Sequence, residues 1–346
     1  MEDRPRARGT YWNPPNRFEP LAVDWDEGEA PSAETVYLVD SSRSALAEND
    51  SPDIPFRFSV NPYRGCEHGC IYCYARPTHE YLGFSAGLDF ETKILVKRQL
   101  PELLRRELGS PRWRPQPVAL SGVTDPYQPV EKKLGITRRV LAVLADFRNP
   151  VVIATKNFLV TRDIDLLQEL AQYEAVHVRI SITSLDPALQ RIMEPRTASP
   201  ARRLEAIRRL SEAQIPVGVL VAPVIPGLTD HEIPAILREA RSHGALAARC
   251  QLVRLPLAVA NLFTRWLQEH FPDRAARVLA RIRETHGGRL NDPRFHVRMR
   301  GVGSYARQVE QLFEVARRRN ALAVDLPPLS SAAFRRPAQQ TLPFQD

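Results

Sequence analysis

Residues 61–74 read NPYRGCEHGCIYCY and contain three of the protein's four cysteines. Cys66, Cys70 and Cys73 have a C-x3-C-x2-C spacing, and a short loop with this spacing can wrap three corners of a soft metal centre. An iron–sulfur cubane held by three protein sulfurs keeps one iron without a protein ligand. The stretch therefore predicts a cluster with an open corner where a small molecule can bind.

Outward from this stretch, apolar runs alternate with helical patterns. Strands are expected at 56–60, 118–121, 151–155, 176–182, 217–222 and 250–255. Helices are expected at 101–108, 138–147, 164–172, 199–213, 230–241 and 259–270. Strand, helix, strand in this order implies parallel pairing, and the first strand leads directly into the cysteines. The sequence thus predicts an α/β fold, either a barrel or a doubly wound sheet.

The two ends of the chain differ from this pattern. Residues 1–55 are rich in proline and acidic residues and predict an irregular N-terminal arm with one strand near 36–39. Residues 56–272 hold the alternating elements, and 273–322 predict a helical C-terminal extension. Residues 323–346, rich in proline and small residues, predict a disordered tail.

The composition indicates a soluble protein of a reducing compartment, the cytoplasm. Four cysteines in 346 residues make no disulfide framework. The first residues are charged and lead into no apolar core, so no secretory signal is visible. The longest apolar run, 217–225, is interrupted by Pro223 and is far shorter than a membrane span.

The net charge of +8 comes from 48 basic and 40 acidic residues, and the basic ones are mostly arginine. Arginine forks suit phosphates, and a basic surface favours nucleic acid or acidic partners. The alternative is that these arginines lie on solvated helix faces, as expected for Arg202, Arg203, Arg208 and Arg209.

The motif Cys66-x3-Cys70-x-Tyr72-Cys73 resembles the signature of the radical S-adenosylmethionine (SAM) superfamily. Further segments resemble the branch related to spore photoproduct lyase: residues 61–74, 124–129, 155–156, 194–197 and 222–227. This resemblance covers about residues 56–255. The flanking residues 49–53 and 299–301 resemble a bacterial subgroup of that branch whose substrate is unassigned.

The resemblance implies a partial (βα)6 barrel and a [4Fe-4S] cluster on Cys66, Cys70 and Cys73. SAM would chelate the fourth iron, and one electron would cleave it to methionine and a 5′-deoxyadenosyl radical that abstracts hydrogen from a substrate. The cofactor supplies this chemistry, and the protein holds the geometry and keeps the site dry.

The resemblance also implies which residues line SAM. These are Tyr72, Gly122, Thr124, Asp125, Lys156, Ser181 and Ala222. Each has an ordinary alternative: Asp125 as the acceptor in a proline-flanked turn, Lys156 as an exposed lysine, Ser181 as a buried hydroxyl, and Ala222 as a small core residue.

Tyr74 follows the last cysteine, as in photoproduct lyase, where a tyrosine takes part in hydrogen transfer. Aromatic packing is the competing interpretation. The lyase has a hydrogen-donating cysteine at the position of Gly122, so thymine-dimer repair by the same mechanism is not expected here. Cys250 lies inside an apolar strand and is interpreted as a core residue.

Two other classes of function stay open at this point. One is a radical SAM enzyme that acts on a peptide or small metabolite rather than on a nucleobase in DNA or RNA. The other is a non-catalytic iron–sulfur or zinc protein, in which His68, His79 or Cys250 completes a zinc site. Zinc sites usually build from two paired C-x2-C arms, and no second pair exists.

Three partners follow from these hypotheses. A radical SAM enzyme needs a low-potential electron donor similar to flavodoxin or ferredoxin. A nucleobase substrate implies binding of nucleic acid. Gln339, Leu342 and Phe344 fit a Q-x-x-L-x-F pattern that resembles the peptides docking on bacterial sliding clamps.

Overall fold

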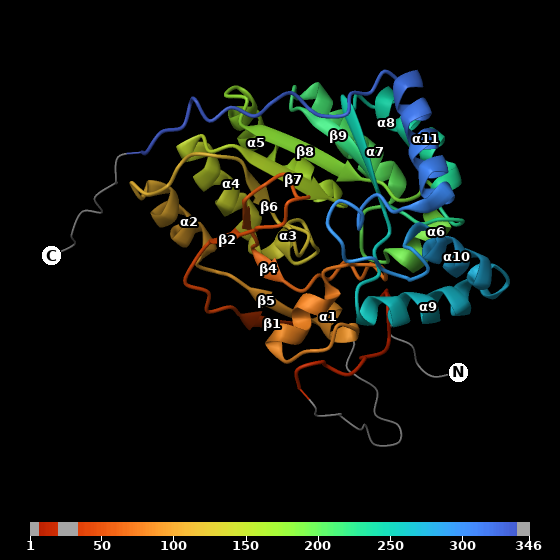
Figure 1. Ribbon diagram of the computed structural model, residues 1–346. Helices are drawn as coiled ribbons and strands as arrows, with labels where there is room; N and C mark the ends of the chain where they lie inside the picture. Colours follow the sequence, from red (N-terminus) through yellow and green to blue (C-terminus); the bar gives the residue numbers. More distant parts are fainter. Residues whose placement is uncertain (1–6, 20–33, 338–346) are drawn as a thin grey trace.

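The computed structural model describes residues 7–19 and 34–337 of the chain. Its centre is a mostly parallel sheet with helices packed against it (Figure 1). Six parallel strands lie side by side in the order of the sequence: β3 (Phe58–Val60), β6 (Val118–Leu120), β7 (Val151–Thr155), β8 (Val176–Ser181), β9 (Val217–Val224) and β10 (Ala247–Leu252). The short strand β2 (Leu46–Glu48) joins β3 antiparallel at one edge. The expected α/β class is confirmed.

Helices connect consecutive strands, as the alternating pattern predicts. They are α2 (Leu100–Gly109), α4 (Ile136–Phe147), α5 (Ile164–Ala171), α7 (Pro200–Glu212) and α8 (Ile233–Ser242). Helix α9 (Ala258–His270) follows the last strand, β10. Helix α7 begins where its sequence indicates, because the Ser199 side chain accepts a hydrogen bond from the backbone of Arg202 and proline occupies the first turn. Buried side chains of α2, α4, α5, α7 and α8 pack on the sheet and form the main core.

A second core lies beside the cysteines. It joins α9 and α10 (Pro272–Thr285) to Cys70, Ile71 and Tyr72. Helix α11 (Gly303–Arg319) then packs on α8 and α10. The helical C-terminal segment therefore supports both the sheet and the cysteine-bearing loop.

The crossover from β3 to β6 is longer than the others and carries the cysteines. Its strands β4 (Tyr63–Arg64) and β5 (Lys93–Val96) form a small sheet with β1 (Val36–Val39) of the N-terminal arm, in the order β1, β5 and β4. It also contains the 3-10 helix η1 (Arg76–Leu82) and helix α1 (Leu88–Thr92). The strand expected at 36–39 is present, whereas β2, β4 and β5 were not predicted, because strands of two to four residues give little alternation.

The remaining short helices connect the main elements. They are α3 (Glu131–Leu134), α6 (Pro187–Met193), η2 (Phe158–Asp163) and η3 (Asp230–Glu232). None of the helices in the described ranges is long and apolar enough to cross a membrane.

Two expectations are corrected. The last strand begins at Ala247 rather than at 250, because small alanines pair closely with Gly218 and Val219 of β9 and lack the β-branched pattern used for prediction. Residues 323–337, expected to be disordered, pack on the fold instead. Ala323 pairs with Ala247, and Phe334 lies against Phe147. The clamp-like residues Gln339, Leu342 and Phe344 lie outside the described residues.

Candidate active site

The cysteine loop, residues 65–73, begins directly after β4 and turns at two glycines. Gly65 and Gly69 have φ values of 80° and 67°, which are left-handed and favour glycine over residues with a Cβ. The amide of Cys66 donates a hydrogen bond to the carbonyl of Phe90 at 2.9 Å. The loop is thus fastened to helix α1, which lies behind it.

Arg76 holds the cysteine loop from inside the protein. Its guanidinium is fully buried and donates to the carbonyl oxygens of Cys70 at 3.1 Å and Gly69 at 3.4 Å. It also pairs with the Glu91 carboxylate at 2.5 Å, and Glu91 is equally buried. Burial raises the pKa of Glu91, whereas the positive charge of Arg76 acts to lower it. This buried pair was not predicted, because arginine and glutamate usually indicate a surface.

The described part of the N-terminal arm covers the cysteine loop from the other side. The amide of Gly9 donates to Glu91 at 2.9 Å. A Cβ at Gly9 would lie 1.7 Å from the carbonyl oxygen of Gly69. The two backbones are therefore in direct contact, and only glycine fits at this position.

The three thiols form one set of donors. Cys66 and Cys70 are less than a tenth exposed, Cys73 is partly buried, and all three are free of disulfides. Burial raises the pKa of Cys70, and it raises the pKa of Cys73 to about 11 with the neighbouring negative charge of Cys66 acting in the same direction. The raised pKa values mean that thiolates are unfavourable here without a cation. Bound iron, being positively charged, would stabilise the three thiolates together. Three cysteines with this spacing in one glycine-hinged loop suit the three-cysteine ligation of a [4Fe-4S] cluster.

The histidines considered for a zinc site have other partners, although His68 also interacts with the Cys66 side chain. The ring nitrogens of His68 lie 3.4 Å from the Asp125 carboxylate and 3.2 Å from Asn157. A ring nitrogen of His79 lies 2.9 Å from a backbone carbonyl. Cys250 lies on β10, next to acidic residues of α11. Across residues 7–19 and 34–337, no three His, Cys, Asp or Glu side chains, the three loop cysteines included, already stand in a metal-binding arrangement, so this observation does not distinguish zinc from an iron–sulfur cluster.

Asp125 ties the ends of β6 and β7 together. Its carboxylate accepts hydrogen bonds from the Thr155 hydroxyl at 2.7 Å and the Lys156 amide at 2.9 Å, and it faces His68. Burial alone would raise the pKa of Asp125, but the charge of His68 and these hydrogen bonds hold it below its usual value. Asp125 therefore makes the hydrogen bonds expected of a residue that stabilises its turn. It also lies at the strand ends, where the family resemblance predicts the SAM site.

Thr124 connects the same turn to the cysteine loop. Its hydroxyl donates to the carbonyl oxygen of Gly65 at 2.7 Å and accepts from Gln128 at 3.0 Å. Gln128 is fully buried and also donates to Gly65 at 3.2 Å. The structure thus brings the predicted residues after β6 against the beginning of the cysteine loop.

Lys156 lies at the end of β7, among other predicted residues. Its ammonium group donates to the carbonyl oxygen of Ala222 at 3.0 Å. It lies 5.8 Å from the centre of the Tyr72 ring and 4.0 Å from the Glu194 carboxylate. The side chain is mostly buried rather than solvated. Three of the residues predicted to line SAM therefore meet at one place.

Glu194 is the buried carboxylate behind this group, and sequence reasoning assigned it no role. It accepts hydrogen bonds from the Tyr72 hydroxyl, from the Thr183 hydroxyl at 2.8 Å and from the Arg203 guanidinium. Although burial opposes ionisation, the charges of Arg203 and Lys156 lower the pKa of Glu194 to about 2. The carboxylate stays ionised and orients Tyr72.

Arg203 corrects one expectation about the surface. It was expected on a solvated helix face, but only 1% of its surface is exposed. Besides Glu194, it donates to the carbonyl oxygen of Ser181 at 3.0 Å, and Ser181 is itself buried. The helical period of α7 places Arg203 on the face that packs against the sheet, which the arginine-rich composition obscured.

Tyr74 lies where the site opens to solvent. The side chain is 46% exposed, and its hydroxyl donates to the carbonyl oxygen of Gly122 at 2.7 Å. The guanidinium of Arg254 lies 4.7 Å from the ring centre. The structure thus joins the predicted hydrogen-relay tyrosine to Gly122, the position at which photoproduct lyase has a cysteine.

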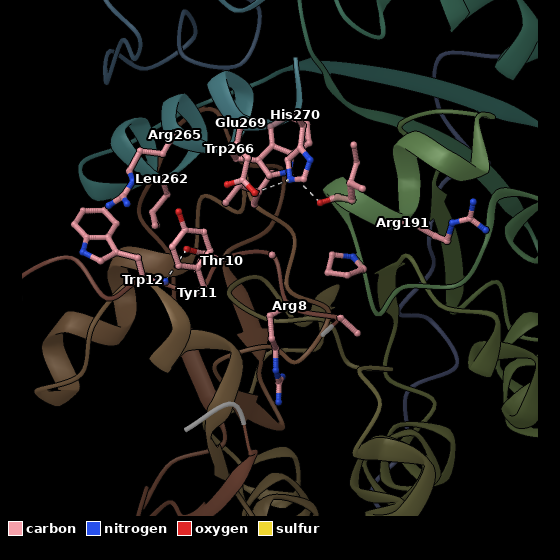
Figure 2. Close-up of a pocket in the computed structure, with 15 residues that line it drawn as sticks. Arg8, Thr10, Tyr11, Trp12, Arg191, Leu262, Arg265, Trp266, Glu269 and His270 are labelled. Carbon is pink, nitrogen blue, oxygen red and sulfur yellow. Dashed lines mark hydrogen bonds and ion pairs between the residues drawn. The ribbon is translucent and has the colours of Figure 1, made fainter. Parts of the chain in front are cut away.

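A cavity of about 280 Å³ lies behind the cysteine loop. In Figure 2, Tyr11 and Trp12 of the N-terminal arm lie below helix α9, which contributes Leu262 and Trp266 to the lining. None of the predicted site residues lines it. The cavity is therefore separate from the strand ends that hold the candidate SAM site.

The family model of the Radical SAM superfamily matches residues 60–240. The chain belongs to this superfamily and is a radical SAM enzyme. A relative from Mycobacterium tuberculosis, described as an uncharacterized protein, is 37% identical over 279 residues, which cover 75% of this chain and 81% of the relative. An uncharacterized protein of Methanocaldococcus jannaschii is 30% identical over 176 residues, covering 51% of this chain and 63% of that one.

Solved structures of spore photoproduct lyase have the same fold. One variant matches with a TM-score of 0.57 and 16% identity, covering 83% of this chain and 80% of the lyase. The lyase complexed with dinucleoside spore photoproduct gives the same TM-score and coverage. The likeness confirms the radical SAM fold expected from the sequence.

Proposed function

We propose that this radical SAM enzyme acts on a nucleobase in DNA or RNA, in a repair or modification reaction. The observation that carries the proposal is the position of Tyr74, half exposed beside the cysteine loop with an arginine over its ring. The net charge of +8 and the fold shared with a lyase that was solved with dinucleoside spore photoproduct support it. Aromatic rings and arginines are the side chains that proteins use to hold unstacked bases and phosphates.

Cys66, Cys70 and Cys73 would hold a [4Fe-4S] cluster, as the family implies. Cluster and SAM, when bound, supply a 5′-deoxyadenosyl radical that takes a hydrogen atom from the substrate. The protein contributes a loop fixed by buried contacts and a site from which water is excluded. The burial of Cys66 and Cys70 supports this role.

The residues around SAM would be those that meet at the strand ends. Tyr72, Lys156 and Ala222 lie together above the buried Glu194. Gly122, Thr124 and Asp125 follow β6, and Ser181 ends β8. In this arrangement the Lys156 ammonium and the backbone after β6 bind the polar groups of SAM, while Tyr72 is held in one orientation by Glu194.

Tyr74 would serve as the hydrogen-relay residue. Its hydroxyl is held by the Gly122 carbonyl, so the ring has one defined position at the open side of the site. Gly122 brings no thiol, and Cys250 lies away from the site on β10. The reaction therefore differs from one that returns hydrogen from a cysteine at that position.

A low-potential donor similar to flavodoxin or ferredoxin would supply the electron, and the cytoplasm is the compartment that suits four free cysteines. The clamp-like residues Gln339, Leu342 and Phe344 stay a prediction. A pull-down with purified sliding clamp tests them, and equal recovery of a Leu342→Ala, Phe344→Ala double variant would remove the idea.

The test of the substrate class is the rate of 5′-deoxyadenosine formation by the reconstituted enzyme. We expect single-stranded oligonucleotides to bind and to change this rate. Peptides and small metabolites are tested in parallel under the same anaerobic conditions. The nucleobase proposal fails when oligonucleotides neither bind nor change the rate of SAM cleavage.

A further inference from the structure

Two distant segments meet at the open side of the site. The Asp53 carboxylate accepts hydrogen bonds from Arg298 at 2.8 and 2.5 Å and from the amide of His296 at 3.2 Å. The carbonyl of Met299 accepts from the amide of Leu252 at the end of β10 at 3.0 Å. The segment 291–300 is therefore held both by the N-terminal arm and by the last strand. These contacts bring Asp53, in the flanking motif at 49–53, to the residues just before the flanking motif at 299–301.

Arg254 follows β10 and lies next to this anchored segment. Its guanidinium lies over the Tyr74 ring, and in the described part of the chain it makes no ion pair or hydrogen bond. Burial lowers the pKa of Arg254, and the nearby charge of Arg298 acts in the same direction. Stacking on a ring uses only the face of a guanidinium, so the N–H groups at its edge stay available for an anion. The half-buried position places a positive charge beside the candidate hydrogen-relay residue.

An exposed aromatic ring accompanies this arginine. Phe295 is 50% exposed, and the guanidinium of Arg298 lies 4.8 Å from its ring centre. Because Arg298 is held in turn by Asp53, the ring is supported from one side and open on the other. We call Tyr74, Arg254, Phe295 and Arg298 the rim. It combines two exposed rings with an arginine that makes no ion pair among the described residues, although the charge of Asp53 acts on it.

We propose that the rim binds the sugar–phosphate strand on either side of the target base, with Arg254 contacting one backbone phosphate and Phe295 stacking on a neighbouring base. This inference rests on the proposed function and names the residues that recognise its substrate. A planar fork suits a phosphate, and every base offers a face for stacking. The rim is a loop surface without a groove-reading helix, so it fits an unpaired strand or an everted nucleotide rather than a closed duplex.

The test measures binding of a fluorescent single-stranded oligonucleotide to the cluster-containing enzyme by anisotropy over a range of salt concentrations. Arg254→Gln should weaken binding roughly tenfold and lower the salt dependence by about one phosphate contact. Phe295→Ala should weaken it roughly tenfold with an unchanged salt dependence, and Phe295→Tyr should restore the affinity. Arg208→Gln removes the same charge from an exposed site on α7 and should bind as the parent does.

A scan of methylphosphonate linkages sharpens the test. Neutralising the linkage that Arg254 contacts should weaken oligonucleotide binding by the parent enzyme. The affinity of Arg254→Gln should not change, because this variant has already lost the contact to that phosphate. When the parent binds oligonucleotides but Arg254→Gln matches it in affinity, salt dependence and linkage scan, the rim inference is overturned and the proposed function stands. When the parent binds no oligonucleotide, both are overturned. Equal iron content and thermal unfolding of all variants show that folding does not account for the differences.

Discussion

The cysteine loop and the rim adjoin each other at residues 73 and 74, yet they are built in opposite ways. The cysteine loop is enclosed, and the buried Arg76 and Glu91 hold its backbone. The rim is open, with exposed rings and an arginine stacked on Tyr74. A reactive cofactor requires one fixed, dry geometry, whereas a substrate must enter and leave. The difference agrees with the proposal that the cysteine loop serves the cofactor and the rim serves the substrate.

Loss of the buried arginine should have the largest effect on stability. Arg76→Met leaves Glu91 without its partner in the core, and we expect the free energy of unfolding to fall by about 3–5 kcal/mol, with loss of bound iron. Chemical denaturation and iron analysis measure these effects. The double variant Arg76→Met, Glu91→Gln should regain part of the stability. A single variant as stable as the parent would show that the enclosed side does not depend on this pair.

A substitution at Lys156 should lower the affinity for SAM without unfolding the protein. Lys156→Met removes the donor that contacts the Ala222 carbonyl. If the ammonium binds SAM, a lost charged hydrogen bond weakens SAM binding by about 1.5–3 kcal/mol. Anaerobic equilibrium dialysis measures the affinity. Lys132→Met, an exposed change on α3, serves as the control. SAM affinity equal to that of the parent would remove Lys156 from the site.

The close contact of the N-terminal arm can be broken at one glycine. Gly9→Ala places a methyl group against the carbonyl oxygen of Gly69, and such overpacking costs about 1–3 kcal/mol. We expect the arm to move off the cysteine loop and the cluster to bleach faster in air. Gly109→Ala is the matched control, because the added Cβ at the end of α2 would lie 3.9 Å from Phe147, an ordinary contact. Identical bleaching rates in both variants would show that the arm does not protect the cluster.

Among these variants, a substitution in the rim should change the free energy of unfolding least. Tyr74→Phe removes only the hydrogen bond to the Gly122 carbonyl, and we expect a loss of about 1 kcal/mol in unfolding free energy. If Tyr74 is the hydrogen relay, as proposed, the effect of the substitution on turnover of the substrate should be far larger. Thermal unfolding and product formation are measured together. A variant that turns over as the parent does would make Tyr74 a packing residue.

Local patterns predicted most of the framework. Consecutive apolar runs predicted six strands, and the three cysteines lie in one short loop, so neither required knowledge of distant contacts. The start of β10 was placed three residues late, because its alanines carry no strand signal. The packed segment 323–337 was read as disordered from composition alone, although Ala323 pairs with the sheet.

The missed residues share a physical cause. Arg76, Glu194 and Arg203 are charged and buried, and their burial depends on partners that the fold supplies. The pairing of Asp53 with Arg298 joins residues 245 positions apart, which no local pattern can indicate. Sequence reasoning therefore located the cysteine loop and the ends of the strands, and it overlooked the buried side chains that hold them in place.

The most direct test of the central claim is reductive cleavage of SAM by the anaerobically reconstituted enzyme. The parent should contain about four iron and four sulfide ions per chain and should form 5′-deoxyadenosine on reduction with SAM. Cys66→Ala, Cys70→Ala and Cys73→Ala should each lose this activity, whereas Cys250→Ala should keep it. Cysteine-loop variants that cleave SAM as well as the parent would contradict the assignment of the cluster to this loop.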